Sequence, residues 1–80
     1  MQLGTRWDVG DEPPQSLDEP MLRAITRVEA ELEADGIDPS GWRWTLTWLE
    51  RRPIAELDDG TLVRQSHDGT VSIVPPSDED

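Results

Sequence analysis

The chain has 80 residues, with 18 Asp and Glu against seven Arg, no Lys, no Cys and a formal net charge of −11 at pH 7. This length suits a single domain, and the lack of Cys excludes disulfides and thiolate metal sites. The negative charge argues against direct binding to nucleic acid or to anionic membranes. No stretch approaches the roughly 18 to 20 apolar residues that cross a bilayer, and the N-terminus lacks a secretory pattern, so we expect a cytoplasmic protein.

The charge is uneven along the chain. Residues 1–40 hold ten acids and three Arg, residues 41–74 hold five acids and four Arg, and residues 75–80 hold three acids. The second half, apart from the last residues, is therefore nearly neutral. Any acidic interaction surface is expected in the first half.

The first predicted element is a strand over residues 2–9, where apolar and polar residues alternate. Gly4 weakens this prediction, because glycine is a poor strand former. Residues 10–15 follow, and their two prolines cannot continue a central strand. We expect an extended linker there.

A helix is predicted next. Ser16 and Glu19 match a capping box, but Asp18 as the N-cap places Pro20 at the second helical position, where its missing N–H costs nothing. The face predicted to be buried recurs at helical spacing. It consists of Met21, Leu22, Ile25, Val28 and Leu32. Gly36 supplies the left-handed residue after the helix, which places Ile37 to touch Leu32 in a Schellman motif.

After a turn at residues 38–41, a strand is predicted over residues 42–50. Strict alternation places one large apolar row on a single face. This row consists of Trp42, Trp44, Leu46 and Trp48. We predict that it is the core beneath the helix. The alternative is a stacking platform for single-stranded nucleic acid, which requires a basic groove that this nearly neutral region lacks.

Arg51-Arg52-Pro53 is expected to break the strand pattern. Shorter strands are predicted over residues 54–57, 61–65 and 70–74, separated by Asp-Gly turns. The fold class is therefore α+β, with one amphipathic helix packed on one face of a three- to five-stranded antiparallel meander. We predict a single domain over residues 1–76 and an acidic, disordered tail over residues 77–80.

Candidate partner-binding residues lie at the end of the helix and in the first strand. Glu31, Glu33 and Asp35 occupy the last turns, where the helix dipole favours cations, and Asp38 adds to the same end. They form either a patch for a basic partner or a solubilising surface. Trp7 either pads the edge of the core or leaves an exposed indole that anchors a partner.

No catalytic, cofactor or metal site is predicted. Asp58, Asp59 and Asp68 lie in turns that select Asp-Gly for backbone reasons, and they lack the spacing of a calcium loop. His67 is the single His and is interpreted as a turn residue. The glycines do not form a phosphate-binding loop, and an 80-residue fold leaves little room for a pocket. We therefore expect a protein that is not an enzyme and holds no cofactor.

Two segments carry a resemblance. They are Leu3-Gly4-Thr5-Arg6-Trp7 and the run from Gly41 to Glu50, which reads Gly-Trp-Arg-Trp-Thr-Leu-Thr-Trp-Leu-Glu. The second is similar to a segment of small uncharacterised actinobacterial proteins. This resemblance implies a stable domain in a bacterial cytoplasm and carries no known activity.

The leading hypothesis is a small, acidic, non-enzymatic protein-interaction domain. Its partner would be a protein with a basic surface, bound through the acidic helix end or an exposed part of the sheet. One alternative is a nucleic-acid mimic that inhibits a DNA-binding protein, which requires two rows of carboxylates at phosphate-like spacing. Another is a homodimeric structural protein, favoured if Leu49 and an edge strand such as residues 70–74 are exposed. We expect a monomer or a weak homodimer.

Overall fold

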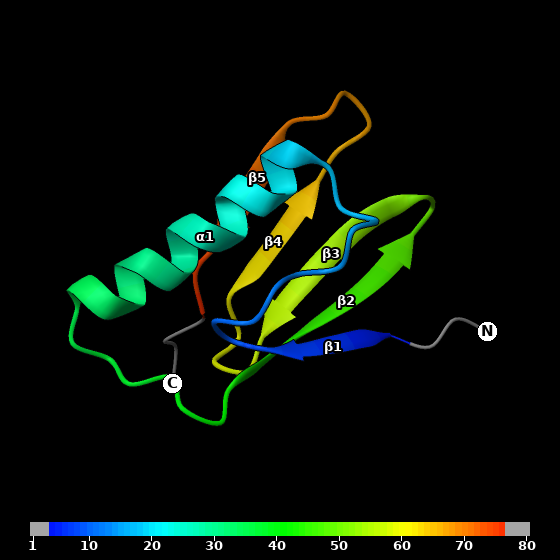
Figure 1. Ribbon diagram of the computed structural model, residues 1–80. Helices are drawn as coiled ribbons and strands as arrows, with labels where there is room; N and C mark the ends of the chain where they lie inside the picture. The colour runs from blue at the N-terminus through cyan, green and yellow to red at the C-terminus, as the bar shows by residue number, and fades with distance from the viewer. Residues whose placement is uncertain (1–3, 77–80) are drawn as a thin grey trace.

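A five-stranded antiparallel sheet forms the base of the computed structural model, which describes residues 4–76 (Figure 1). Its strands pair in chain order, each antiparallel to its neighbours. They are β1 (Thr5–Asp8), β2 (Arg43–Leu49), β3 (Arg52–Leu57), β4 (Leu62–Gln65) and β5 (Val71–Val74). One helix, α1 (Glu19–Ala34), packs on one face. The predicted α+β meander is confirmed.

The N-terminal segment joins the sheet as an edge strand beside β2. Its regular part runs over Thr5–Asp8, which is shorter than the predicted 2–9. The first two residues of that prediction and the whole predicted tail lie outside the described residues. The opposite edge of the sheet is β5.

Both ends of α1 follow from local sequence signals. Asp18 is the N-cap, since its carboxylate accepts from the Met21 N–H at 3.5 Å and Pro20 lies in the first turn. At the other end, the Ile37 N–H donates to the Leu32 carbonyl at 3.0 Å. The Gly36 N–H donates to the Glu33 carbonyl at 3.1 Å, which completes a Schellman motif. Asp18 rather than Ser16 therefore begins the helix.

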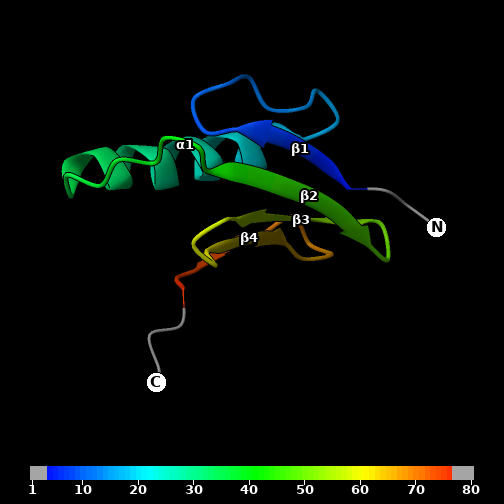
Figure 2. The same cartoon turned by 90° about the horizontal axis from the view of Figure 1, so that it is seen from below.

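The core lies between α1 and the sheet. In Figure 1 the helix lies along β4 and β5, and the segment from β1 to α1 passes on the same side of the sheet. Figure 2 shows both on one side in the perpendicular view. The buried side chains come from the helix, the linker and four strands. They are Trp7, Leu17, Met21, Ala24, Ile25, Val28, Leu32, Trp44, Leu46, Ala55, Leu57 and Val63.

The predicted row on β2 is only partly core. Trp44 and Leu46 are buried and Trp42 is half-buried, but Trp48 is 39% exposed. The helix follows β4 and β5 and leaves this end of β2 uncovered. The prediction that the helix covers the whole row is therefore wrong at Trp48.

The β2–β3 connection also differs from the prediction. Glu50 and Arg51 form a two-residue turn with φ of 54° and 67°, and β3 begins directly at Arg52. Pro53 is the second residue of β3, and the pairing with β4 begins only at the next residue. Its missing N–H thus falls outside the described β3–β4 ladder. The expected break at residues 51–53 is instead a tight hairpin.

Candidate functional site

The molecule has two ends of different character. The acidic end comprises the last turns of α1 and the loop to residue 41. The hairpin end comprises the β2–β3 turn, the β4–β5 turn and the start of α1, which lie together in Figure 1. The predicted carboxylates belong to the first end, and a cavity that was not predicted belongs to the second.

The acidic end brings together the four predicted carboxylates. Glu31, Glu33, Asp35 and Asp38 are all exposed, and the last turn of α1 contains no basic residue. One is paired, since the Arg27 Nε lies 3.4 Å from a Glu31 oxygen. The negative end of the helix dipole lies at the same place, so these charges oppose the helix.

Two further features complete the acidic end. Asp38 accepts from the Ser40 hydroxyl at 2.7 Å and from the Ser40 N–H at 3.1 Å, and these bonds lower the pKa of its carboxyl. Ile37 lies between the carboxylates in the chain and is 41% exposed. The acidic end therefore offers an exposed apolar side chain within a segment of exposed carboxylates.

Trp7 does not belong to an exposed surface. It is only 8% exposed, and its ring stacks on Trp44 at 6.2 Å between centroids with 16° between planes. The Trp44 indole N–H donates to Glu29 at 2.9 Å, whereas the buried Trp7 Nε1 has no partner among the described residues. The structure therefore matches the interpretation of Trp7 as a core residue. The alternative prediction, an exposed indole that anchors a partner, is wrong.

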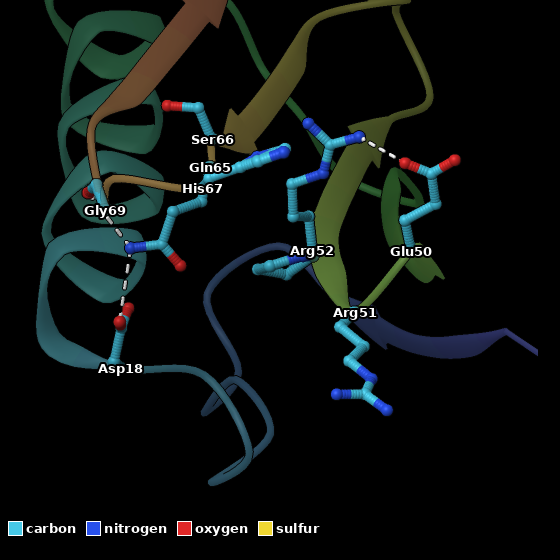
Figure 3. Close-up of a pocket in the computed structure, with 9 residues that line it drawn as sticks. Asp18, Glu50, Arg51, Arg52, Gln65, Ser66, His67 and Gly69 are labelled. Atoms are coloured by element: carbon cyan, nitrogen blue, oxygen red, sulfur yellow. Dashed lines mark hydrogen bonds and ion pairs between the residues drawn. The ribbon is translucent and has the colours of Figure 1, made fainter.

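A cavity of about 410 Å³ opens at the hairpin end (Figure 3). Its lining comes from three separate parts of the chain. These residues are Asp18, Glu50, Arg51, Arg52, Pro53, Gln65, Ser66, His67 and Gly69. Figure 3 shows the His67 side chain extending toward Arg52, while Arg51 extends away on the other side of its turn.

Hydrogen bonds hold part of this lining in place. An Arg52 guanidinium nitrogen lies 3.0 Å from a Glu50 carboxylate oxygen, and the Arg52 side chain is only 31% exposed. The Gln65 amide donates to Asp18 at 3.2 Å and to the Gly69 carbonyl at 3.1 Å. Arg51 and His67 have no hydrogen bond or ion pair within the described chain. His67 therefore brings to the cavity a side chain that has no hydrogen-bond partner among residues 4–76.

The β2–β3 turn, which carries part of this lining, has a backbone conformation that is unfavourable for its two central residues. Positive φ at both central positions suits Asn-Gly, whereas a side chain with a Cβ costs about 1–2 kcal/mol per residue in the left-handed region. Glu50 and Arg51 both occupy that region. Strain of this kind is often found at functional sites.

The β4–β5 turn has a structural explanation. Asp68 accepts from the Thr70 N–H at 3.0 Å and from the Ser66 hydroxyl at 2.8 Å. These bonds lower the pKa of Asp68 to about 2. Within residues 4–76, no three His, Asp or Glu side chains are grouped to hold a metal ion. No helix in the described part of the chain is both long and apolar enough to span a membrane.

The hairpin-end cavity was missed because its residues are far apart in the sequence. The pair Arg51-Arg52 was interpreted as a strand break and His67 as an isolated turn residue. A partial signal was present, because apolar residues stop at Leu49 and resume at Pro53, which leaves room only for a short turn. The pairing that brings Arg52 near Gln65 depends on the full sheet register.

No protein-family model matches the chain, and the searches of curated proteins and of solved structures found no similar protein. The functional inference therefore depends on the geometry of the two ends.

Proposed function

We propose that the protein is a non-catalytic interaction domain whose acidic end binds a basic surface of another protein. The observation that supports it is the group of exposed carboxylates, Glu31, Glu33, Asp35 and Asp38, at a helix end without a basic residue. Natural sequences tend to break local rules at functional sites, and here every charge at the helix end has the unfavourable sign.

The exposed Ile37 supports a macromolecular partner. Protein interfaces combine an apolar core with a polar rim. Ile37 provides the apolar contact, and the carboxylates provide the rim and steer a basic partner toward it. The acidic end contains both components within one short segment.

The test uses a fluorescently labelled oligoarginine peptide as the probe. We expect the Glu31→Gln/Glu33→Gln/Asp35→Asn variant to bind it about tenfold more weakly, because each exposed ion pair contributes up to about 1 kcal/mol. The matched control is Asp11→Asn/Glu12→Gln/Glu56→Gln, which changes the net charge equally. If both variants weaken binding to the same degree, net charge alone accounts for binding and the proposal is wrong.

A second candidate function is a homodimer formed through β5. This strand is a free edge of the sheet, its four residues are uncharged, and Ile73 is exposed. Natural edge strands commonly carry charges that prevent such pairing, as Arg6 and Asp8 do on β1. Leu49 is 56% exposed, so both conditions stated for a dimer are met.

The dimer is tested by light scattering on the full chain. We expect association to increase with salt, because each copy carries a charge of −11. Ile73→Lys should abolish it, while Thr5→Lys on the β1 edge should leave it unchanged. A monomer at every salt concentration would rule this candidate out.

A further inference from the structure

We propose that the cavity at the hairpin end binds an oxyanion group, a phosphate or a carboxylate, through Arg52 and His67. This site differs from the acidic end in position, in charge and in ligand. Its volume of about 410 Å³ lies within the range of natural ligand pockets, about 300–1,000 Å³.

Arg52 is the central residue of this site. Its guanidinium has five N–H donors in a fixed fork that matches a carboxylate or phosphate, and Glu50 holds it from one side. The side chain is two-thirds covered by its neighbours, so its position is partly fixed before a ligand arrives. Preorganisation of this kind reduces the entropy lost on binding.

Arg64 adds positive charge beside the site. Arg64 lies opposite Ile54 in the register, and Arg52 is two residues earlier on the same strand, which makes the two arginines diagonal neighbours. A small hollow of about 90 Å³ lies between them and is also lined by Gln65. Arg52 therefore borders two adjoining hollows, with His67 on one side and Arg64 on the other.

The two carboxylates that line the cavity already accept hydrogen bonds from the protein. One Asp18 oxygen accepts from the Met21 N–H and the other from the Gln65 amide, while Glu50 pairs with Arg52. Repulsion from the more distant acids decays over about 8 Å at physiological salt. The affinity of the cavity for an oxyanion therefore depends mainly on the N–H donors in contact with it.

The strained turn supports the same conclusion. Asn-Gly would satisfy the backbone at residues 50 and 51 at lower cost, yet these positions carry Glu50 and Arg51. Glu50 contributes the contact that orients Arg52. A binding role for Arg52 explains why an unfavourable residue occupies the turn.

The experiment is an NMR titration of the full-length ¹⁵N-labelled chain at constant ionic strength, with inorganic phosphate and with acetate in separate arms. We expect saturable shifts confined to residues 50–53 and 65–69 with at least one anion. Saturation by phosphate alone identifies a phosphate site, and saturation by acetate alone identifies a carboxylate site. If neither anion saturates, or if the shifts extend evenly along α1, the proposal is overturned.

Variants test the assignment of the residues. Arg52→Gln should weaken binding about tenfold, as expected for loss of a charge-assisted hydrogen bond. Arg23→Gln is the matched control, because Arg23 is exposed and pairs with Glu19. This substitution also removes one positive charge. If Arg52→Gln does not fold, His67→Gln in the exposed turn replaces it, with weaker binding expected. Equal affinity of the site variant and the Arg23 control would contradict the proposal.

Discussion

The two ends of the molecule acquire their charge in different ways. The acidic end is built from residues within one short segment, the last turns of α1 and its following loop. The hairpin end brings Asp18, Arg52 and His67 together from three separate segments. The comparison teaches that a surface made by neighbours in sequence is visible in the sequence, whereas one made by strand pairing is not.

The largest expected effect is at the turn of the hairpin end. Glu50→Asn/Arg51→Gly should raise the free energy of unfolding by about 2 kcal/mol, because Asn and Gly tolerate the left-handed conformation better than Glu and Arg do. Urea denaturation measures the change. Arg51→Ala is the control, since it removes the guanidinium and keeps the Cβ, and it should give no stabilisation. An unchanged double variant would show that this turn stores no strain.

The acidic end contains the opposite case, a left-handed position that already carries glycine. Gly36 has φ of 73°, and apart from its chain neighbours no atom of residues 4–76 lies within 4 Å of an added Cβ, so the cost of substitution is conformational and not steric. Gly36→Ala should lower the free energy of unfolding by about 1 kcal/mol. Gly36→Asn should cost less, because Asn tolerates this conformation. Thermal denaturation compares the stability of the two variants. Equal losses of stability would contradict this explanation.

Charge reversal should change the stability of the fold in opposite directions at the two ends of α1, because the helix dipole has opposite signs there. Glu33→Arg at the acidic end should stabilise the fold by about 0.3–1 kcal/mol, because it replaces an anion with a cation at the negative end of the dipole. Glu19→Arg at the hairpin end should destabilise it, since it removes a favourable anion and the pair with Arg23. Both effects should shrink in high salt. Changes of the same sign would show that net charge outweighs the dipole.

The smallest effect is a pH dependence at both ends. Hydrogen bonds lower the pKa of Asp68 to about 2 and lower that of Asp38, from an ordinary value of 3.8. The contribution of each carboxylate is therefore complete above about pH 4 and is lost as the pH falls through its folded-state pKa. Asp68→Asn should reduce the loss of stability between pH 4 and 2. A carboxyl titration of Asp68 by NMR near 3.8 would disprove the explanation.

The elements themselves were largely predictable. Asp18, Pro20 and Gly36 specified both ends of α1, and the alternation from Trp42 to Leu46 specified the core face of β2. The acidic end was predictable because its residues share one helix turn and one loop. The sequence does not decide between core and surface for Trp7, since its burial depends on stacking with Trp44 in a neighbouring strand.

The sequence by itself determined the type and the order of the elements, because caps, turn residues and hydrophobic periodicity act over only a few residues. The tertiary structure alone decided which tryptophans are covered: Trp7 and Trp44 are shielded, and Trp48 is not. It also decided that Arg52 meets His67 at one cavity. These outcomes depend on the path of the helix and on strand register, which form only when distant segments pack together.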